Sequence, residues 1–220
     1  MRPPEAPATG LREALAAVGR ALALEPTETQ LDTLLAYLAL LQRWNGTYNL
    51  TAVRDPAQML TQHLADCLAV IAPLRRHCAT AQAQRILDVG SGGGLPGVVI
   101  AVLNPSIHVT CVDTVGKKAA FVRHAAGELG LKNLFGEHAR VEQMKAVPFD
   151  VIVSRAFASL DDFTRLTRRH LAPLGVWMAM KGKTPDDEMA QLPAELVVFH
   201  VEHLIVPGLQ ADRCLVWIRP

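Results

Sequence analysis

The stretch that decides the fold is Ile86-Leu87-Asp88-Val89-Gly90-Ser91-Gly92-Gly93-Gly94-Leu95-Pro96-Gly97. A short apolar run precedes the glycines and a longer apolar run follows them. This pattern predicts a strand over residues 85–89, a turn, and a helix that ends near residue 102. Glycines adopt backbone angles that other residues resist, and they let a ligand approach the main chain closely. In open α/β sheets the crevice at the carboxyl ends of the strands is the usual ligand site, so we predict a ligand-binding loop here.

Downstream of this loop, short apolar runs alternate with helical patterns. Strands are predicted over residues 107–112, 133–138, 149–154 and 176–180, and helices over 117–129, 160–171 and 185–191. This alternation is typical of a parallel sheet with helices on both faces. Two final apolar runs, 196–206 and 214–218, are joined by a turn at Pro207-Gly208 and predict an antiparallel hairpin at the edge. The expected fold is therefore α/β, an open, mostly parallel seven-stranded Rossmann-like sheet with an antiparallel C-terminal edge strand.

The N-terminal part of the chain has helical rather than strand patterns. Residues 1–10 are Pro/Ala-rich and expected to be disordered, residues 11–80 to form a helical cap, and residues 81–220 to form the sheet domain. Thr27, with Gln30 three residues later, predicts a capping box at the start of a helix that fades at residues 44–46. Asp55-Pro56 predicts the start of another helix, with Asp as N-cap and Pro in the first turn.

Composition restricts the class of protein. The four cysteines are far apart and predict reduced, buried thiols, and we expect no metal site. No apolar run of membrane-spanning length and no secretory leader is visible, so we expect a cytoplasmic protein. The net charge is +1, but residues 81–183 carry thirteen Lys/Arg against eight acids. That excess is either ordinary surface variation or a basic face that meets phosphate.

The spacing of the glycines restricts which ligand the loop can bind. A nicotinamide fingerprint requires Gly or Ala where Leu95 stands, and no Gly-Lys-Ser/Thr follows for a phosphate loop. Asp88-x-Gly90-x-Gly92-x-Gly94 instead resembles the first motif of class I methyltransferases, which bind S-adenosylmethionine. Asp113 ends the second predicted strand, where an acid can accept hydrogen bonds from ribose hydroxyls. This residue suits a nicotinamide dinucleotide and S-adenosylmethionine equally.

The fourth predicted strand ends at Ser154-Arg155, where methyltransferases place their acceptor chemistry. The Asn/Asp-Pro-Pro-Tyr/Phe run used to methylate exocyclic amines is absent, and no cysteine is well placed for pyrimidine C5 methylation. Guanine N7 remains a suitable acceptor, because its lone pair carries no proton and needs positioning rather than a general base. Arg155 either orients the methionine carboxylate, the base or a phosphate, or is a surface residue at a strand end.

Several motifs in the same order resemble the bacterial RsmG (GidB) family over residues 30–220. They are Asp88–Gly97, Asp113-x-x-x-Lys117-Lys118, Arg140-Val141-Glu142, Ser154-Arg155-Ala156, Lys181-Gly182, Trp44-Asn45-x-x-Tyr48-Asn49-Leu50-Thr51 and His63-x-x-Asp66. The resemblance implies methylation of N7 of the guanine at position 527 of 16S ribosomal RNA, in the 530 loop of the 30S subunit, by a monomeric enzyme. The implied S-adenosylmethionine contacts are Asp88, Gly90, Ser91, Gly92, Gly94, Leu95, Asp113, Val141, Glu142 and Arg155.

Other roles stay open at this point. His63 and Asp66 are three residues apart and therefore lie on one side of a helix. They are candidates, with Arg155, for positioning the substrate. The alternative is a polar pair that ties the cap to the core. Candidate RNA contacts are Lys117, Lys118, Arg165, Arg168 and Lys181, each of which also suits a solvated surface. The alternative functions are methylation of another RNA or a small molecule, a nicotinamide-dependent oxidoreductase, and a non-catalytic ribosome-assembly factor.

Overall fold

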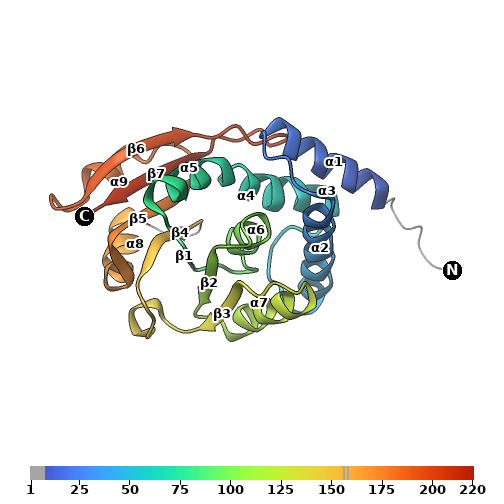
Figure 1. Cartoon of the computed structure of the whole chain (residues 1–220), viewed down its shortest axis with the longest axis horizontal. Coiled ribbons are helices and arrows are strands. Elements are labelled where there is room, and N and C mark those ends of the chain that lie inside the picture. Colours follow the sequence, from blue (N-terminus) through green and yellow to red (C-terminus); the bar gives the residue numbers. More distant parts are fainter. Residues whose placement is uncertain (1–7, 156, 158) are drawn as a thin grey trace.

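Seven strands form one sheet in the order β3-β2-β1-β4-β5-β7-β6 (Figure 1). The structure is a computed structural model and describes residues 8–155, 157 and 159–220. The strands are β1 (Arg85–Val89), β2 (His108–Asp113), β3 (Leu134–His138), β4 (Phe149–Ser154), β5 (Leu171–Lys181), β6 (Val197–His203) and β7 (Cys214–Arg219). β1 to β5 pair in parallel, so their carboxyl ends share one edge of the sheet.

The C-terminal hairpin lies at the edge, as expected, but its two strands have different positions. β7 is antiparallel to both β5 and β6 and lies between them, which leaves β6 outermost. The residues 214–218 of β7 are a continuous apolar run that is buried, whereas those of β6 are mostly half-buried or exposed. A continuous apolar run is typical of a strand covered on both faces. Because β7 is antiparallel, it begins at the edge where the parallel strands end.

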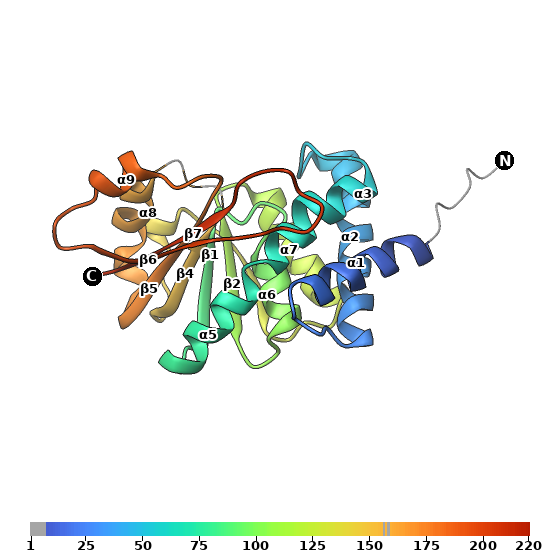
Figure 2. The same ribbon diagram turned by 90° about the horizontal axis from the view of Figure 1, so that it is seen from above.

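One face of the sheet carries most of the helices (Figure 2). They are α1 (Ala8–Ala21), α2 (Glu28–Tyr48), α3 (Pro56–Met59), a π-helical turn η1 (Leu60–Ala65), α4 (Asp66–Leu68), α5 (Ile71–Ala81), α6 (Gly97–Leu103) and α7 (Gly116–Glu128). On the other face lie α8 (Leu160–Thr167) and α9 (Asp186–Ala190), with 3-10 turns η2 (Val141–Gln143) and η3 (Arg168–His170). The residues expected to form a cap thus pack on the helix layer of the sheet, with α2 against α6 and α7.

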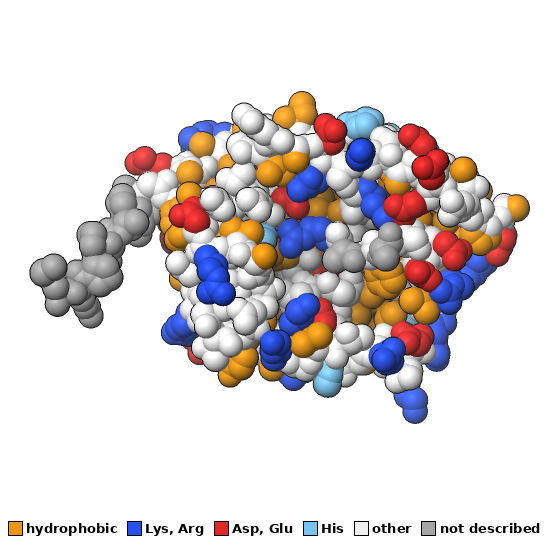
Figure 3. All heavy atoms as spheres, turned by 180° about the vertical axis from the view of Figure 1, so that it is seen from behind, with side chains coloured by type: hydrophobic (Ala, Val, Ile, Leu, Met, Phe, Trp, Pro, Cys, Tyr) orange, Lys and Arg blue, Asp and Glu red, His pale blue; other side chains and the backbone are white. Residues whose placement is uncertain are grey.

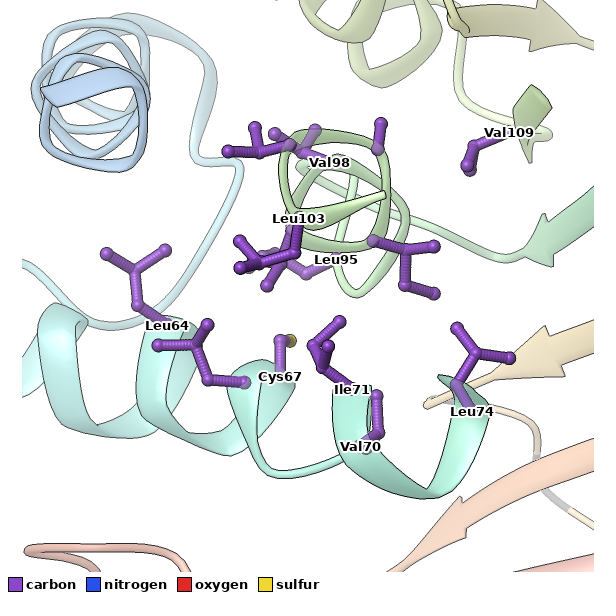
Figure 4. Close-up of a cluster of buried hydrophobic side chains, with 14 of the residues drawn as sticks. Leu64, Cys67, Val70, Ile71, Leu74, Leu95, Val98, Leu103 and Val109 are labelled. Carbon is purple, nitrogen blue, oxygen red and sulfur yellow. The ribbon is translucent and has the colours of Figure 1, made fainter. Parts of the chain in front are cut away.

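Burial of apolar side chains joins these helices to the sheet domain. Leu64, Cys67 and Ile71 point from the N-terminal helices toward Leu95 and toward Leu103 of α6 (Figure 4). All five are less than 5% exposed. Burial of each side chain of this kind contributes roughly 1.5–3 kcal/mol to the free energy of unfolding. The residues 11–80 and the sheet domain therefore share one hydrophobic core.

Local sequence signals correctly predicted where several helices start. Thr27 and Gln30 form both hydrogen bonds of the capping box, and Asp55 accepts the amide of Gln58 at the start of α3. Two expectations about helix ends were wrong. α2 continues past residue 46 to Tyr48, because the ring of Trp44 packs against Phe121 of α7. The predicted helix over 160–171 is α-helical only to Thr167, continues as the 3-10 turn η3 to His170, and gives way to β5 at Leu171.

The expected disordered start also needs correction. Residues 8–10 belong to α1, and residues 1–7 lie outside the described part of the chain. Among the described residues, no helix combines the length and apolar character needed to cross a membrane. The same residues contain no group of three His, Cys, Asp or Glu side chains arranged to hold a metal ion. The four cysteines are free thiols with buried side chains, as their spacing in the sequence predicted.

Candidate functional site

The glycine loop between β1 and α6 turns back on itself at the carboxyl end of β1. Gly90, Gly92 and Gly94 have φ angles of +69°, +59° and +88°, in the left-handed region that favours glycine. The amides of Gly90 and Ser91 donate to the carbonyl of Val112 in β2, at 2.9 and 3.3 Å. These bonds fasten the loop to the neighbouring strand end.

The space above the loop is open. A Cβ atom built on Gly90 or on Gly92 would meet no atom within 4 Å, so both glycines border free space. The hydroxyl of Ser91 is buried and interacts with the thiol of Cys111 in β2. Open space beside the main-chain atoms of a loop is the form of a ligand-binding cradle.

Two of the predicted contact residues lie behind the loop. Asp88 is fully buried, and its Oδ2 accepts the amide of Gly97 at the start of α6, at 2.8 Å. Burial raises the pKa of Asp88 to about 7. A Cβ on Gly94 would lie 2.7 Å from Cγ2 of Val98, so this glycine faces the helix layer. Asp88 and Gly94 therefore shape the loop from behind, and neither lines the two cavities described next.

Asp113 lies at the end of β2 and faces the loop. Its Oδ2 accepts the amide of Gly92 at 3.0 Å, and its Oδ1 accepts the amide of Val115 at 2.8 Å. Lys118 of α7 stands 3.9 Å from the same carboxylate. Each carboxylate oxygen has a second lone pair, so Asp113 keeps the capacity to accept hydroxyl groups.

A cavity of about 400 Å³ opens beside Asp113; we call it the Asp113 cavity. Its lining consists of Val89, Gly90, Val112, Asp113, Thr114, Val115, Lys118, Ala139, Arg140, Val141, Glu142, Phe157 and Leu166. Val141 and Glu142 of η2, which follow β3, are among these residues. Apolar walls with one carboxylate suit a flat heterocycle joined to a hydroxylated sugar.

A smaller cavity of about 160 Å³ adjoins it over the glycine loop; we call it the glycine-loop cavity. It is lined by Leu41, Leu50, Thr51, His63, Gly90, Ser91, Gly92, Gly93, Leu95, Lys118 and Arg155. Gly90 and Lys118 border both cavities, so the two are contiguous. Four of the lining residues come from the N-terminal helices and the loop after α2.

A third cavity, of about 430 Å³, continues from the glycine-loop cavity; we call it the Asp66 cavity. It is lined by Gln62, His63, Asp66, Arg155, Met180, Lys181, Gly182 and Arg213. His63 and Arg155 border both of these cavities. Figure 3 shows the carboxyl-end face of the sheet hollowed near its centre, with Lys and Arg side chains beside the hollow. The three cavities thus form one trough along the strand ends.

Asp66 is the centre of an ion-pair cluster in this trough. Its carboxylate is 3% exposed and accepts Nε of Arg213 at 2.7 Å, with Nη1 of Arg155 at 3.4 Å. The three side chains come from α4, from the residue after β4 and from the residue before β7. Asp66 therefore ties the N-terminal helices to the sheet, and it also lines the trough, so both alternatives raised by the sequence have structural support.

His63 lies one turn before Asp66 and is 7% exposed. Its Nε2 lies 2.7 Å from the hydroxyl of Thr51. Burial, followed by the nearby charge of Arg155, lowers the pKa of His63 below its usual value of 6.5. The imidazole is therefore neutral at pH 7.

The structure separates the candidate RNA contacts into two groups. Lys118 and Lys181 line the trough, Lys181 with both oxygens of Glu188 at 3.0 and 2.8 Å. Arg165 and Arg168 lie on the exposed side of α8 and η3, where they pair with acids. Lys117 is exposed. Their contact with RNA stays a prediction.

Comparison with solved structures places this architecture in a class. The chain aligns with a SAM-dependent methyltransferase from Aquifex aeolicus with a TM-score of 0.53 and 15% identity, over 74% of this chain and 98% of that one. It aligns with the N-methyltransferase NodS from Bradyrhizobium japonicum, in complex with S-adenosyl-L-homocysteine, with a TM-score of 0.53 and 16% identity, over 76% and 93%. At these identities the likeness concerns the fold. The fold is therefore the one found in S-adenosylmethionine-dependent methyltransferases.

Sequence relatives give the family. The family model described as rRNA small subunit methyltransferase G (GidB) matches residues 30–216. A ribosomal RNA small subunit methyltransferase G from Acidovorax ebreus (strain TPSY) is 60% identical over 219 residues, covering 96% of each chain. Another, from Leptothrix cholodnii, is 61% identical over 209 residues, covering 95% of each. The chain belongs to the GidB family of small-subunit rRNA methyltransferases, as its motifs predicted.

The residues present fit S-adenosylmethionine. The open space at Gly90 and Gly92 leaves room for the donor's methionine portion, and Ser91 lines the same cavity. Asp113 and the apolar walls of the Asp113 cavity suit its ribose and adenine. When bound, S-adenosylmethionine supplies an electrophilic methyl group. The contacts of individual residues with the donor remain predictions.

Sequence reasoning missed two residues of the trough. Leu41 belongs to an apolar stripe of α2 in the sequence, where it suggests only core packing, although it lines the glycine-loop cavity. Arg213 precedes β7 in a segment rich in acids, and nothing in its neighbourhood singled it out. The signal that identifies Arg213 is topological, because only an antiparallel last strand begins at the carboxyl-end edge.

Proposed function

We propose that the protein transfers a methyl group to N7 of the guanine at position 527 of 16S ribosomal RNA, in the 530 loop of the 30S subunit. The observation that carries this proposal is the continuous trough. The glycine-loop cavity, which would hold the donor's methionine portion, shares two lining residues with the Asp66 cavity. His63 and Arg155 stand where the two meet, so an acceptor in the Asp66 cavity would lie next to the donor.

The side chains around this junction suit an acceptor that carries no proton. Guanine N7 attacks through a lone pair in the ring plane, and its methylation requires alignment rather than a base. Asp66 is the carboxylate among the described lining residues of the Asp66 cavity, and two guanidinium groups already hold it. In this proposal Asp66 keeps Arg155 and Arg213 in place rather than accepting a proton. Arg155 is the residue nearest to both cavities that can orient a base or a carboxylate.

The charge of the Asp66 cavity supports a nucleic-acid acceptor. Arg155, Lys181 and Arg213 line it, against the carboxylate of Asp66 and that of Glu188, which pairs with Lys181. The planar guanidinium group of arginine donates two parallel hydrogen bonds to phosphate oxygens. A target nucleotide that is turned out of its stack would place its base toward the donor and its phosphate against these cations.

The proposed substrate context is the 30S particle in the cytoplasm. The described chain forms one α/β body without a separate RNA-binding domain, so the shape of the ribosomal particle would supply specificity. The test is methyl transfer from labelled S-adenosylmethionine to 30S subunits that lack the modification, followed by mapping of the labelled nucleotide. Label at N7 of that guanine is the expected result.

Other outcomes would redirect the proposal. Transfer to a different nucleotide, or to naked RNA but not to 30S subunits, would replace the substrate while leaving donor chemistry intact. Tight binding to 30S subunits without transfer would favour a non-catalytic assembly factor. A variant with Arg155→Ala provides the internal control, because it should lose transfer if the junction is the reaction site.

A further inference from the structure

The cap helix α2 makes a direct polar contact with the glycine loop. The hydroxyl of Tyr37 donates to the carbonyl of Gly93 at 2.7 Å, across fifty-six positions of sequence. Tyr37 is fully buried, with its ring 6.2 Å from that of Phe121 in α7. Burial raises the pKa of Tyr37 well above its usual value of 10, so the hydroxyl stays protonated and remains a donor.

The glycine loop requires contacts from outside its own residues to hold one conformation. Gly92 and Gly94, on either side of Gly93, have positive φ angles, and consecutive glycines lose more conformational freedom on ordering than other residues. The amide bonds to Val112 and Asp113 fasten the loop on its sheet side. The Tyr37 hydroxyl fastens it on the opposite side. A Cβ on Gly93 would lie 2.9 Å from Cδ1 of Leu41, so α2 also packs closely against the loop.

We infer that Tyr37 is a positioning residue for donor binding, which makes α2 part of the S-adenosylmethionine site rather than a cap beside it. The hydrogen bond from Tyr37 holds the glycine loop in the conformation that keeps the glycine-loop cavity open. Without it, the loop occupies the binding-competent conformation for a smaller fraction of the time. The apparent dissociation constant for the donor then rises by the inverse of that fraction.

The test compares Tyr37→Phe with a matched control, Thr167→Val. The buried hydroxyl of Thr167 accepts Nε1 of Trp177 at 2.8 Å and donates to the carbonyl of Phe163, and Thr167 lines none of the three cavities. Each substitution removes one buried hydroxyl and keeps the shape of the side chain. We expect both to lower the midpoint of urea unfolding, because each leaves a buried partner unsatisfied. Only Tyr37→Phe should weaken S-adenosylhomocysteine in calorimetric titration, by about fivefold to tenfold.

Steady-state kinetics adds a measurement that would not change if Tyr37 only stabilised the fold. Saturating donor selects the competent loop, so Tyr37→Phe should raise the donor KM and leave kcat nearly unchanged. Normal donor affinity in Tyr37→Phe, or an equal loss of affinity in Thr167→Val, would overturn the inference.

A measurement on the wild-type protein keeps the inference testable if Tyr37→Phe does not fold. Coupling between two sites is reciprocal, so donor binding should slow hydrogen exchange in α2 around Tyr37 as well as in the loop. Protection of residues 90–95 without any protection of α2 would contradict a role for Tyr37 in donor binding.

Discussion

A Gly92→Val substitution should weaken donor binding strongly while leaving the fold intact. Gly92 has a φ of +59°, and a Cβ there meets no atom within 4 Å, so valine fits sterically in the free protein. The left-handed conformation costs a residue with a Cβ roughly 1–2 kcal/mol of unfolding free energy. In the complex, however, the new side chain occupies the glycine-loop cavity, whose volume is about 160 Å³.

Relief of that overlap requires the donor or the loop to move. Forced adjustments in packed sites cost about 1–3 kcal/mol, which corresponds to a roughly 5- to 150-fold weaker donor affinity. Gly130 provides the matched control, because it has a φ of +64° and open space around its Cβ, but follows α7 outside the described cavities. Gly130→Val should lose similar stability in urea and bind S-adenosylhomocysteine normally by calorimetry. Normal donor affinity in Gly92→Val would refute our placement of the donor over this loop.

Three further predictions follow from buried charges and thiols. Asp66→Asn should lower the free energy of unfolding in urea by about 2 kcal/mol, because it leaves two partly buried guanidinium groups without their shared carboxylate, and an unchanged free energy would argue against the cluster. The pKa of Asp88 is raised from 3.8 to about 7, so ionisation is disfavoured in the folded state, and its contribution to stability is lost as pH rises from about 4 to 7. Wild type should therefore lose up to about 1.4 kcal/mol per pH unit relative to Asp88→Asn in that window, and parallel stability profiles of the two proteins would contradict this. Burial raises the pKa of Cys67 to about 12 and of Cys78 to about 11, so a thiol reagent at pH 8 should modify the native protein only as fast as it unfolds.

Helix starts were predictable because their signals are local. Thr27 and Asp55 accept amides within three residues of themselves, so the capping residues are visible in any short window. Helix ends were less predictable because they depend on packing. The residues around Gly46 favour a break, but Trp44 gains contacts with Phe121 of a helix more than seventy residues away, and α2 continues.

The candidate site was predictable in part for the same reason. The glycine loop and Asp113 follow strands directly, so their place at the carboxyl-end edge follows from the parallel pattern. Arg213 was not predictable, because its position depends on β7 being inserted antiparallel beside β5. Asp66 and Arg155 were both noted in the sequence, but their contact joins elements eighty-nine positions apart.

The sequence by itself determined the class of fold, the glycine loop and the family, because periodicity, glycine spacing and motif order are properties of the chain. Tertiary structure decided how the parts meet. The N-terminal helices read as a separate cap, yet the shared core brings Leu41, Leu50, Thr51 and His63 to the glycine loop. Such contacts arise when distant apolar faces are buried together, and the chemistry that surrounds the loop is set by whichever residues that burial places beside it.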